Sequence, residues 1–283
     1  TTGSLWSSIW QISWPMLLIM IFNFLVGFVD VYVAGFISPE VQAAVGFVSL
    51  LYFTVIILAN AISIGTVALV SRAAGAGDFG RAVEVARQSL LLGGAVAVAL
   101  SLAGFFFARE IVAAAGFPEE IREIARVFLR IFSLALGADY MLIISNAVFR
   151  AGGDVRAALL TMLSVSAVNI IGDFVLVFGI PGVPGLGYPG IAFATAFSAA
   201  LGMGISFVLF LRSRWRPLYR GSWAMRPAAI RQIVGLGWPA AMLQIAWNGG
   251  TIVLYNILGR LGEDSIVALA AIANGLRIEG AIF

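Results

Sequence analysis

Residues 159–182 read LLTMLSVSAVNIIGDFVLVFGIPG, a segment long and apolar enough to cross a lipid bilayer as a single helix. The segment nevertheless contains Asn169 and Asp173, which lie four residues apart and therefore share one face of a helix. An ionised aspartate at the centre of a membrane helix costs roughly 2.5 to 3.5 kcal/mol on insertion scales. Because unused acids should be rare at such depth, we expect this pair to have a function.

The composition of the whole chain is that of a membrane protein. Of its 283 residues, 61% are hydrophobic and 11% are charged, whereas soluble domains are about half apolar and a quarter charged. Eight apolar runs are long enough to span a bilayer, namely residues 9–36, 43–70, 86–108, 125–149, 157–180, 190–211, 230–258 and 266–283. We predict an all-α, polytopic membrane protein, in which a six-helix N-terminal bundle precedes about one and a half to two helices of a second, pseudo-symmetric bundle.

Cysteine and histidine are both absent from the chain. Their absence excludes disulfides, thiol nucleophiles, histidine metal sites and Ser-His-Asp catalysis. We therefore predict that the protein is not an enzyme and carries no cofactor.

All seventeen basic residues are arginines, and their distribution predicts the orientation of the chain. If the N-terminus is cytoplasmic, eleven arginines, including Arg150, fall in inner loops and five on the outer side. Cytoplasmic loops carry the excess of basic residues, so we expect a multi-pass protein of the cell (inner or plasma) membrane with its N-terminus inside. The arginines are scattered over short loops, and we expect no nucleic-acid partner.

An internal repeat predicts how the helices are divided between two lobes. A shift of 224 residues aligns Trp14-Pro15 with Trp238-Pro239, and each copy reads as a proline-bearing helix, a turn and a second helix. We predict an N-terminal six-helix lobe over 1–211, a basic cytoplasmic linker over 212–229, and the start of a C-terminal lobe over 230–283, with helix 7 and part of helix 8. The alternative is a chance similarity of two apolar helices. We expect the remaining helices of the second lobe to belong to the same protein, which would act as a monomer, and Pro15 to kink the first helix.

Two glycine-rich loops carry a more specific signal. They are VSRAAGAGDFGRAVEVARQS at residues 70–89 and NAVFRAGGDVRAA at 146–158. Both resemble loops of the multidrug and toxic compound extrusion (MATE) transporters, and the resemblance covers the whole chain, including LRIEG at 276–280. A generic glycine-rich turn would explain either loop alone, but it explains the ordered set poorly.

One branch of that family, called DinF-like, is the most similar to this chain. It carries an aspartate late in the first helix, an Asn-x-x-x-Asp pair in the fifth and a threonine early in the sixth, which correspond to Asp30, Asn169, Asp173 and Thr195. The resemblance implies that these four residues form the cation- or proton-coupling site, where Na⁺ is a possible ligand. The other well-known branch relies on an acid in the seventh helix, and residues 230–258 contain no carboxylate.

The depth of these residues supports the same grouping. At about 1.5 Å per residue, Asp30, Asp173 and Thr195 all lie roughly 8 to 10 Å below the outer surface. Three helices would thus bring oxygen ligands or proton carriers to one level. Two adjacent buried acids would also favour a shared proton or cation. The structural alternative is that the acids only hold helices together through hydrogen bonds.

Four further residues within the apolar runs are candidates for the lining of a cavity or a gate. Asp139 and Asn146 share a helix face, and Asn146 lies near the inner end of its run, where it could also serve helix packing. Met141 and Met162 could line a pliable apolar surface, although most methionines at helical spacing simply pack.

The resemblance implies a secondary active antiporter that exports amphipathic, often cationic, small molecules in exchange for protons or sodium ions. Its partners would be this small-molecule substrate and the lipid bilayer. A first alternative is a lipid-linked oligosaccharide flippase of the same superfamily, which should have more basic residues in its cavity. A second alternative, from another class, is an ion channel in which the acids form a selectivity ring.

Overall fold

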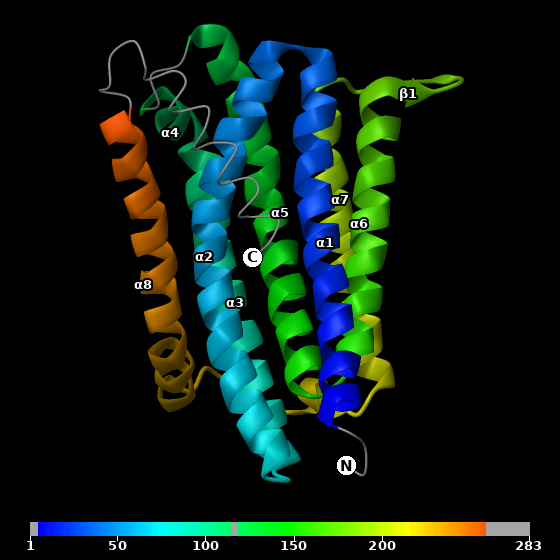
Figure 1. Ribbon diagram of the computed structural model, residues 1–283, viewed down its shortest axis with the longest axis vertical. Helices are drawn as coiled ribbons and strands as arrows, with labels where there is room; N and C mark the ends of the chain where they lie inside the picture. The colour runs from blue at the N-terminus through cyan, green and yellow to red at the C-terminus, as the bar shows by residue number, and fades with distance from the viewer. Residues whose placement is uncertain (1–4, 115–117, 259–283) are drawn as a thin grey trace. The chain divides into compact units, whose positions relative to one another are not determined.

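The computed structural model describes residues 5–114 and 118–258 of the chain. Long helices make up most of it (Figure 1). In chain order the elements are α1 (Leu5–Ile37), α2 (Pro39–Gly75), α3 (Phe79–Phe106), α4 (Ala108–Ala114), α5 (Glu119–Ala151), α6 (Val155–Phe178), β1 (Gly179–Ile180), β2 (Val183–Pro184), α7 (Pro189–Arg212), the 3-10 helix η1 (Arg216–Arg220) and α8 (Pro227–Leu258).

Six of the described helices are long and apolar enough to cross a membrane, which confirms the all-α, polytopic fold class. They are α2, α3, α5, α6, α7 and the part of α1 from Ser13 to Ile37. The seventh apolar run also forms a helix, α8, but this helix is not among the six. The eighth run and the LRIEG motif lie outside the described residues.

The chain divides into two compact units, Thr1–Gly237 and Trp238–Phe283. Within the first unit the six long helices run side by side (Figure 1). Helix α5 packs against α2, α3, α6 and α7, while α1 packs mainly against α6 and α2. Since α5 is in contact with most of the bundle, side chains on its faces reach both the apolar core and the interior polar site.

The two glycine-rich loops fold into the same turn. In the first loop, Gly77 adopts a φ of 78° and the amide of Asp78 donates to the carbonyl of Ala73 at 3.0 Å. In the second, Gly153 adopts a φ of 84° and the amide of Asp154 donates to the carbonyl of Phe149 at 2.8 Å. A positive φ favours glycine, which explains why each loop has a glycine directly before its aspartate.

The opposite end of the bundle contains two features that the apolar runs did not predict. The third run was expected to continue to Ala108, but α3 ends at Phe106 and the short helix α4 begins at Ala108. Between α6 and α7, the strands β1 and β2 form a two-residue antiparallel hairpin. Both features connect the spanning helices and do not alter the fold class.

Candidate functional site

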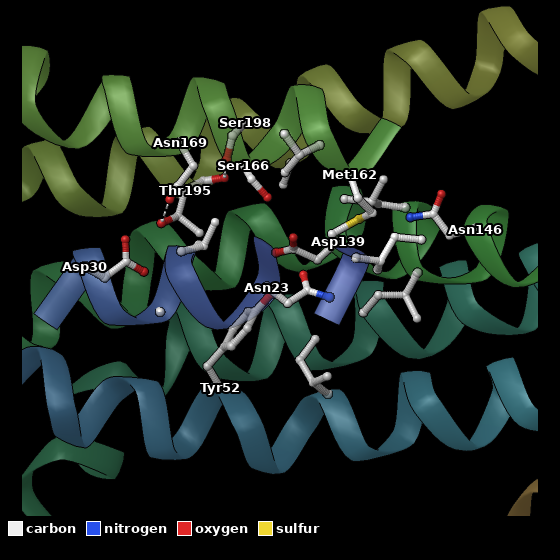
Figure 2. Close-up of a pocket in the computed structure, with 18 of the residues that line it drawn as sticks. Asn23, Asp30, Tyr52, Asp139, Asn146, Met162, Ser166, Asn169, Thr195 and Ser198 are labelled. Carbon is white, nitrogen blue, oxygen red and sulfur yellow. Dashed lines mark hydrogen bonds between the residues drawn. The ribbon is translucent and has the colours of Figure 1, made fainter. Parts of the chain in front are cut away.

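A cavity of about 470 Å³ lies inside the first unit, and residues of α1, α2, α5, α6 and α7 line it. Apolar side chains such as Ile56, Phe132 and Val165 form part of its wall. Polar side chains are distributed along its whole length, from Asp30 and Thr195 at one end to Asn146 at the other (Figure 2). The cavity therefore combines an apolar surface with several separate polar positions.

The outer cluster, defined as Asp30, Asn169, Asp173 and Thr195, contains all four predicted coupling residues. The side-chain amide of Asn169 donates to Thr195 Oγ1 at 3.2 Å, and the Thr195 hydroxyl donates to the carbonyl of Ile191, also at 3.2 Å. The carboxyl groups of Asp30 and Asp173 are close enough to interact. The structure thus brings together residues from α1, α6 and α7, as the depth estimate indicated.

Close packing of α6 on α7 explains why Asn169 and Thr195 lie within hydrogen-bond distance of each other. A Cβ atom added to Gly172 would lie 3.1 Å from the Cβ of Ala194, which is tighter than ordinary contact. Gly172 directly precedes Asp173, and Ala194 directly precedes Thr195. The absence of a side chain at Gly172 lets the two backbones approach, so that Asn169 can bond to Thr195 across the helix pair.

Asp173 differs from its neighbours in its position relative to the cavity. Asp30, Asn169 and Thr195 line the cavity, whereas Asp173 is not part of the lining. Its side chain is fully buried. Because it interacts with Asp30, which does line the cavity, Asp173 lies directly behind the cavity wall at this point.

Several oxygen atoms of the outer cluster have no hydrogen-bond partner. They are Asp30 Oδ1, Asn169 Oδ1 and both carboxyl oxygens of Asp173. Each buried polar atom left unsatisfied costs about 1 to 3 kcal/mol, and more if it is charged. A proton or a hard cation would satisfy these oxygens, since oxygen ligands suit such ions.

The described residues contain no group of three or more His, Cys, Asp or Glu side chains that could hold a metal ion. In the outer cluster, two carboxyl groups, one amide oxygen and one hydroxyl would instead supply the ligands. This donor set has at most two formal negative charges, which fits a proton or a monovalent cation.

Asp139 is a second acidic position in the cavity wall. It lies on α5, is 7% exposed, and interacts with the hydroxyl of Tyr52 on α2. Its other oxygen, Oδ2, has no partner. Figure 2 shows Asp139 between the outer cluster and Asn146. The structure therefore places Asp139 in the cavity wall, as the sequence suggested. It lies on α5, whereas Asp30 lies on α1.

The structure separates the other predicted cavity residues. Asn146 and Met162 line the end of the cavity that is far from Asp30 (Figure 2), and Asn146 Oδ1 has no partner. Met141 lies elsewhere, since its Cε is 3.7 Å from the position that a Cβ of Gly93 or Gly94 would occupy on α3. The side chain of Met141 thus fills the space beside two glycines, and the structure does not bring it to the cavity.

Arg150 is a cavity residue that the sequence analysis assigned to an inner loop. The apolar run was expected to end at Phe149, but α5 continues to Ala151 and Arg150 lies in its last turn. Together with Asp139, Ile143 and Asn146 it lines the cavity. These four residues have the spacing i, i+4, i+7 and i+11, which is that of one helix face. This spacing could have shown from the sequence that Arg150 continues the polar face of Asp139 and Asn146.

Other polar lining residues also escaped prediction. They are Asn23, Ser49, Tyr52, Asn60, Ser166 and Ser198. Serine and asparagine side chains in membrane helices often serve helix packing and interhelical hydrogen bonds, so the sequence alone does not assign them to a cavity.

Pro15 lies inside α1, where it is buried. Proline has no amide hydrogen, and α1 therefore lacks one backbone hydrogen bond at this point. Asp30 is fifteen residues further on, about four turns along the same helix.

Comparisons with known proteins agree with this architecture. The sequence profile of the MatE family matches residues 15–175. The uncharacterized transporter YisQ of Bacillus subtilis is 22% identical over 261 residues, which are 92% of this chain and 57% of that protein. The probable multidrug resistance protein NorM of Thermotoga maritima is 26% identical over 268 residues, which are 93% of this chain and 56% of that protein.

A crystal structure of a MATE protein in the bent conformation superposes with a TM-score of 0.83 at 23% identity. The match covers 98% of this chain and 61% of the other, so the two share a fold. The chain spans a little more than half the length of the relatives it matches.

The profile match extends over more than half of the chain and includes the helices that carry Asp30, Asp139, Asn169 and Asp173. The chain belongs to the MatE family, whose members are membrane transporters of the multidrug and toxic compound extrusion type and not enzymes.

Proposed function

We propose that the complete protein carrying this sequence is a secondary active antiporter that exports amphipathic or cationic compounds in exchange for protons or sodium ions. The observation that carries the proposal is the position of the outer cluster. Unpartnered buried oxygens of Asp30 and Asn169 lie in the wall of a cavity that also has apolar surface for a small molecule. Ion and substrate would thus share one compartment.

The charge state of the outer cluster can control the packing of α1. Asp30 belongs to α1 and Asp173 to α6, and these two helices pack against each other. When both carboxyl groups are ionised, they repel each other across this helix pair. One proton or one sodium ion removes the repulsion and allows closer packing. A difference of a few kcal/mol between the charge states is enough to change which of two helix arrangements dominates.

The cavity suits a drug-sized ligand. Pockets that bind such molecules have volumes of about 300 to 1,000 Å³ and mostly apolar walls, and the present cavity of about 470 Å³ falls in this range. Phe53, Phe132 and Met162 offer aromatic and polarisable surface, while Asp30 and Asp139 attract a positive charge. The relatives named as multidrug resistance proteins support this class of substrate.

Two features of the chain argue against the two alternatives. A flippase for lipid-linked oligosaccharide phosphates would need several basic side chains, but Arg150 is the single basic residue among the described residues of the cavity wall. The repeat of Trp14-Pro15 at Trp238-Pro239, and not the lining, argues against an ion channel, because repeated lobes are typical of transporters.

The lobe arrangement and the topology are part of the proposal. The lobes would comprise residues 1–211 and the helices from residue 230 onward, joined by the linker over 212–229. The N-terminus would lie in the cytoplasm of a cell whose plasma membrane holds the protein as a monomer. Rocking of the lobes would open the cavity alternately to each side.

Efflux of a fluorescent amphipathic cation from proteoliposomes tests the proposal. The complete protein should export the cation when a proton or sodium gradient is imposed, and a proton ionophore or removal of sodium should stop export. Asp30→Asn should abolish the dependence on the gradient. Asp154→Asn is the matched control, because Asp154 lies in a loop and makes no side-chain cap to α6. Export that persists after both gradients are collapsed would refute antiport.

A further inference from the structure

Among the described residues of the cavity wall, one side chain is positively charged, that of Arg150, and its guanidinium has an unusual environment. The residue is half-buried in the last turn of α5 and lines the cavity. No described residue forms a hydrogen bond or an ion pair with its side chain. Other described arginines without a partner, such as Arg156 and Arg212, are exposed. A half-buried guanidinium with free donors is suited to an anionic group that arrives from the cavity.

The opposite charge lies on the same helix face. Asp139, eleven residues earlier on α5, also lines the cavity and keeps Oδ2 unpartnered. Eleven residues correspond to about 16 Å along a helix, so the two charges are too far apart to form an ion pair with each other. Asn146 and Ile143 lie between them on this face.

This spacing matches the length of an extended small molecule. The cavity of about 470 Å³ accommodates a drug-sized ligand, and Leu142, Ile143 and Met162 supply apolar wall between the two charges. The Tyr52 hydroxyl, which also belongs to the cavity wall, lies close enough to Asp139 to interact with its carboxyl group. The cavity therefore has a negative position near its middle, a positive position at its inner end and apolar surface between them.

We propose that this cavity selects bipolar substrates, in which an amine group binds Asp139 and a carboxylate or similar anionic group binds Arg150. The proposal rests on the proposed function and narrows its substrate class. A compound that carries only the cation would bind Asp139 and leave the Arg150 guanidinium unpaired. A compound with both charges would satisfy both ends, and its anion would receive two parallel N–H donors from the guanidinium.

Three probes with one aromatic skeleton test the proposal. The first has an amine and a carboxylate at opposite ends, the second is its methyl ester, and the third is its N-acetyl derivative. The complete wild-type protein in detergent should bind the amino acid about tenfold more tightly than the ester, as one additional charge-assisted contact implies. The N-acetyl compound should bind more weakly than the amino acid, since it cannot pair with Asp139.

Four variants test whether Arg150 and Asp139 cause the preference for the amino acid over the ester. Arg150→Gln should bring the affinity for the amino acid down to that for the ester and leave the affinity for the ester unchanged. Asp139→Asn should weaken binding of the amino acid and the ester alike. Arg156→Gln removes an exposed arginine outside the cavity wall and should preserve the preference. Arg150→Lys keeps the charge without the planar fork and should retain part of the preference.

Two results would overturn the proposal. The first is that the wild-type protein binds the ester as tightly as the amino acid. This test does not depend on the folding of any variant. The other is an Arg150→Gln variant that weakens both probes equally, which would make Arg150 a structural residue of the helix end. If the ester is still exported along an ion gradient in either case, the antiport function stands and the bipolar preference alone fails. If neither probe is exported along a gradient, the proposed function itself fails.

Discussion

The linker and the cavity differ in whether their buried polar side chains have hydrogen-bond partners. The linker cap, defined as residues 84–88 of α3 and residues 213–226, supplies a hydrogen-bond partner to both polar atoms of the Gln88 side chain. Gln88 is 1% exposed, its amide donates to the carbonyl of Ala224 at 2.8 Å, and its oxygen accepts from the amide of Arg226 at 2.8 Å. Arg87 donates to the carbonyls of Leu218 at 2.8 Å and Pro217 at 3.0 Å.

Several buried atoms of the cavity region lack such partners. Unsatisfied atoms occur on Asp30, Asp139, Asn146, Ser166, Asn169 and Asp173. The cap has one comparable atom, the indole nitrogen of Trp215, and its Gln88 and Arg87 bonds tie the linker to α3. The contrast indicates that Gln88 and Arg87 hold the linker in place, whereas the unpartnered atoms in the cavity region have room to bind a ligand, an ion or a proton.

The largest expected effect concerns the unsatisfied acid of the outer cluster. Asp173→Asn should reduce gradient-driven efflux to the rate measured without a gradient, because without the second carboxylate there is no repulsion between α1 and α6 for a proton or a sodium ion to remove. It should not lower the melting temperature, since an amide is less costly to bury than a carboxylate without partners. Efflux from proteoliposomes and thermal unfolding in detergent measure the two effects. A variant that unfolds easily would show that Asp173 is a structural residue.

Replacement of a buried side chain that has hydrogen-bond partners should lower stability and leave the dependence on the ion gradient intact. Gln88→Ala removes two hydrogen bonds to the linker and should destabilise the protein by about 1 to 3 kcal/mol. The molecules that remain folded should keep their dependence on the ion gradient. Gln232→Ala is the matched control, because Gln232 is exposed and accepts one bond from Arg81, so its loss should stay within about 0.5 kcal/mol. Equal melting temperatures for the two variants would break the comparison between linker cap and cavity.

Replacement of Pro15, the predicted kink in α1, should change the rate of transport more than the binding of the coupling ion. Pro15→Ala restores a backbone hydrogen bond worth about 1 kcal/mol in α1. If transport requires this helix to bend, the bending step should become about fivefold slower. Binding of the coupling ion to Asp30 should be retained, since the outer cluster is about four turns away. Titration of purified protein with sodium or protons, together with efflux rates, separates the two quantities. Met16→Ala changes an exposed neighbour on the same helix and serves as the control. Weakened ion binding in Pro15→Ala would contradict the assignment.

The smallest effect is expected for an exposed ion pair of the linker cap. Arg226 pairs with Glu84, and its side chain is 60% exposed. Exposed pairs contribute up to about 1 kcal/mol, so Glu84→Gln should lower the melting temperature slightly, and less so in high salt. Thermal unfolding at two salt concentrations checks this. A loss as large as that of Gln88→Ala would show that charge, and not the buried amide, holds the linker on α3.

Several features of the protein could be predicted from the sequence alone. The length of the apolar runs specifies membrane helices, because a bilayer core has a nearly constant thickness. The four-residue spacing of Asn169 and Asp173 places both on one helix face, and the distance of Asp30, Asp173 and Thr195 from the helix ends indicates a common depth. Each of these inferences needs only the geometry of a single helix.

Only the tertiary structure decided which faces meet. Met141 and Asn146 lie on the same helix, yet Met141 packs beside Gly93 and Gly94 while Asn146 lines the cavity. Arg150 enters the cavity wall because α5 extends past its apolar run, and Gln88 is satisfied by a linker more than a hundred residues away. Spacing along a helix defines depth and relative face, but the rotation of that helix toward its neighbours depends on the packing of all the side chains between them.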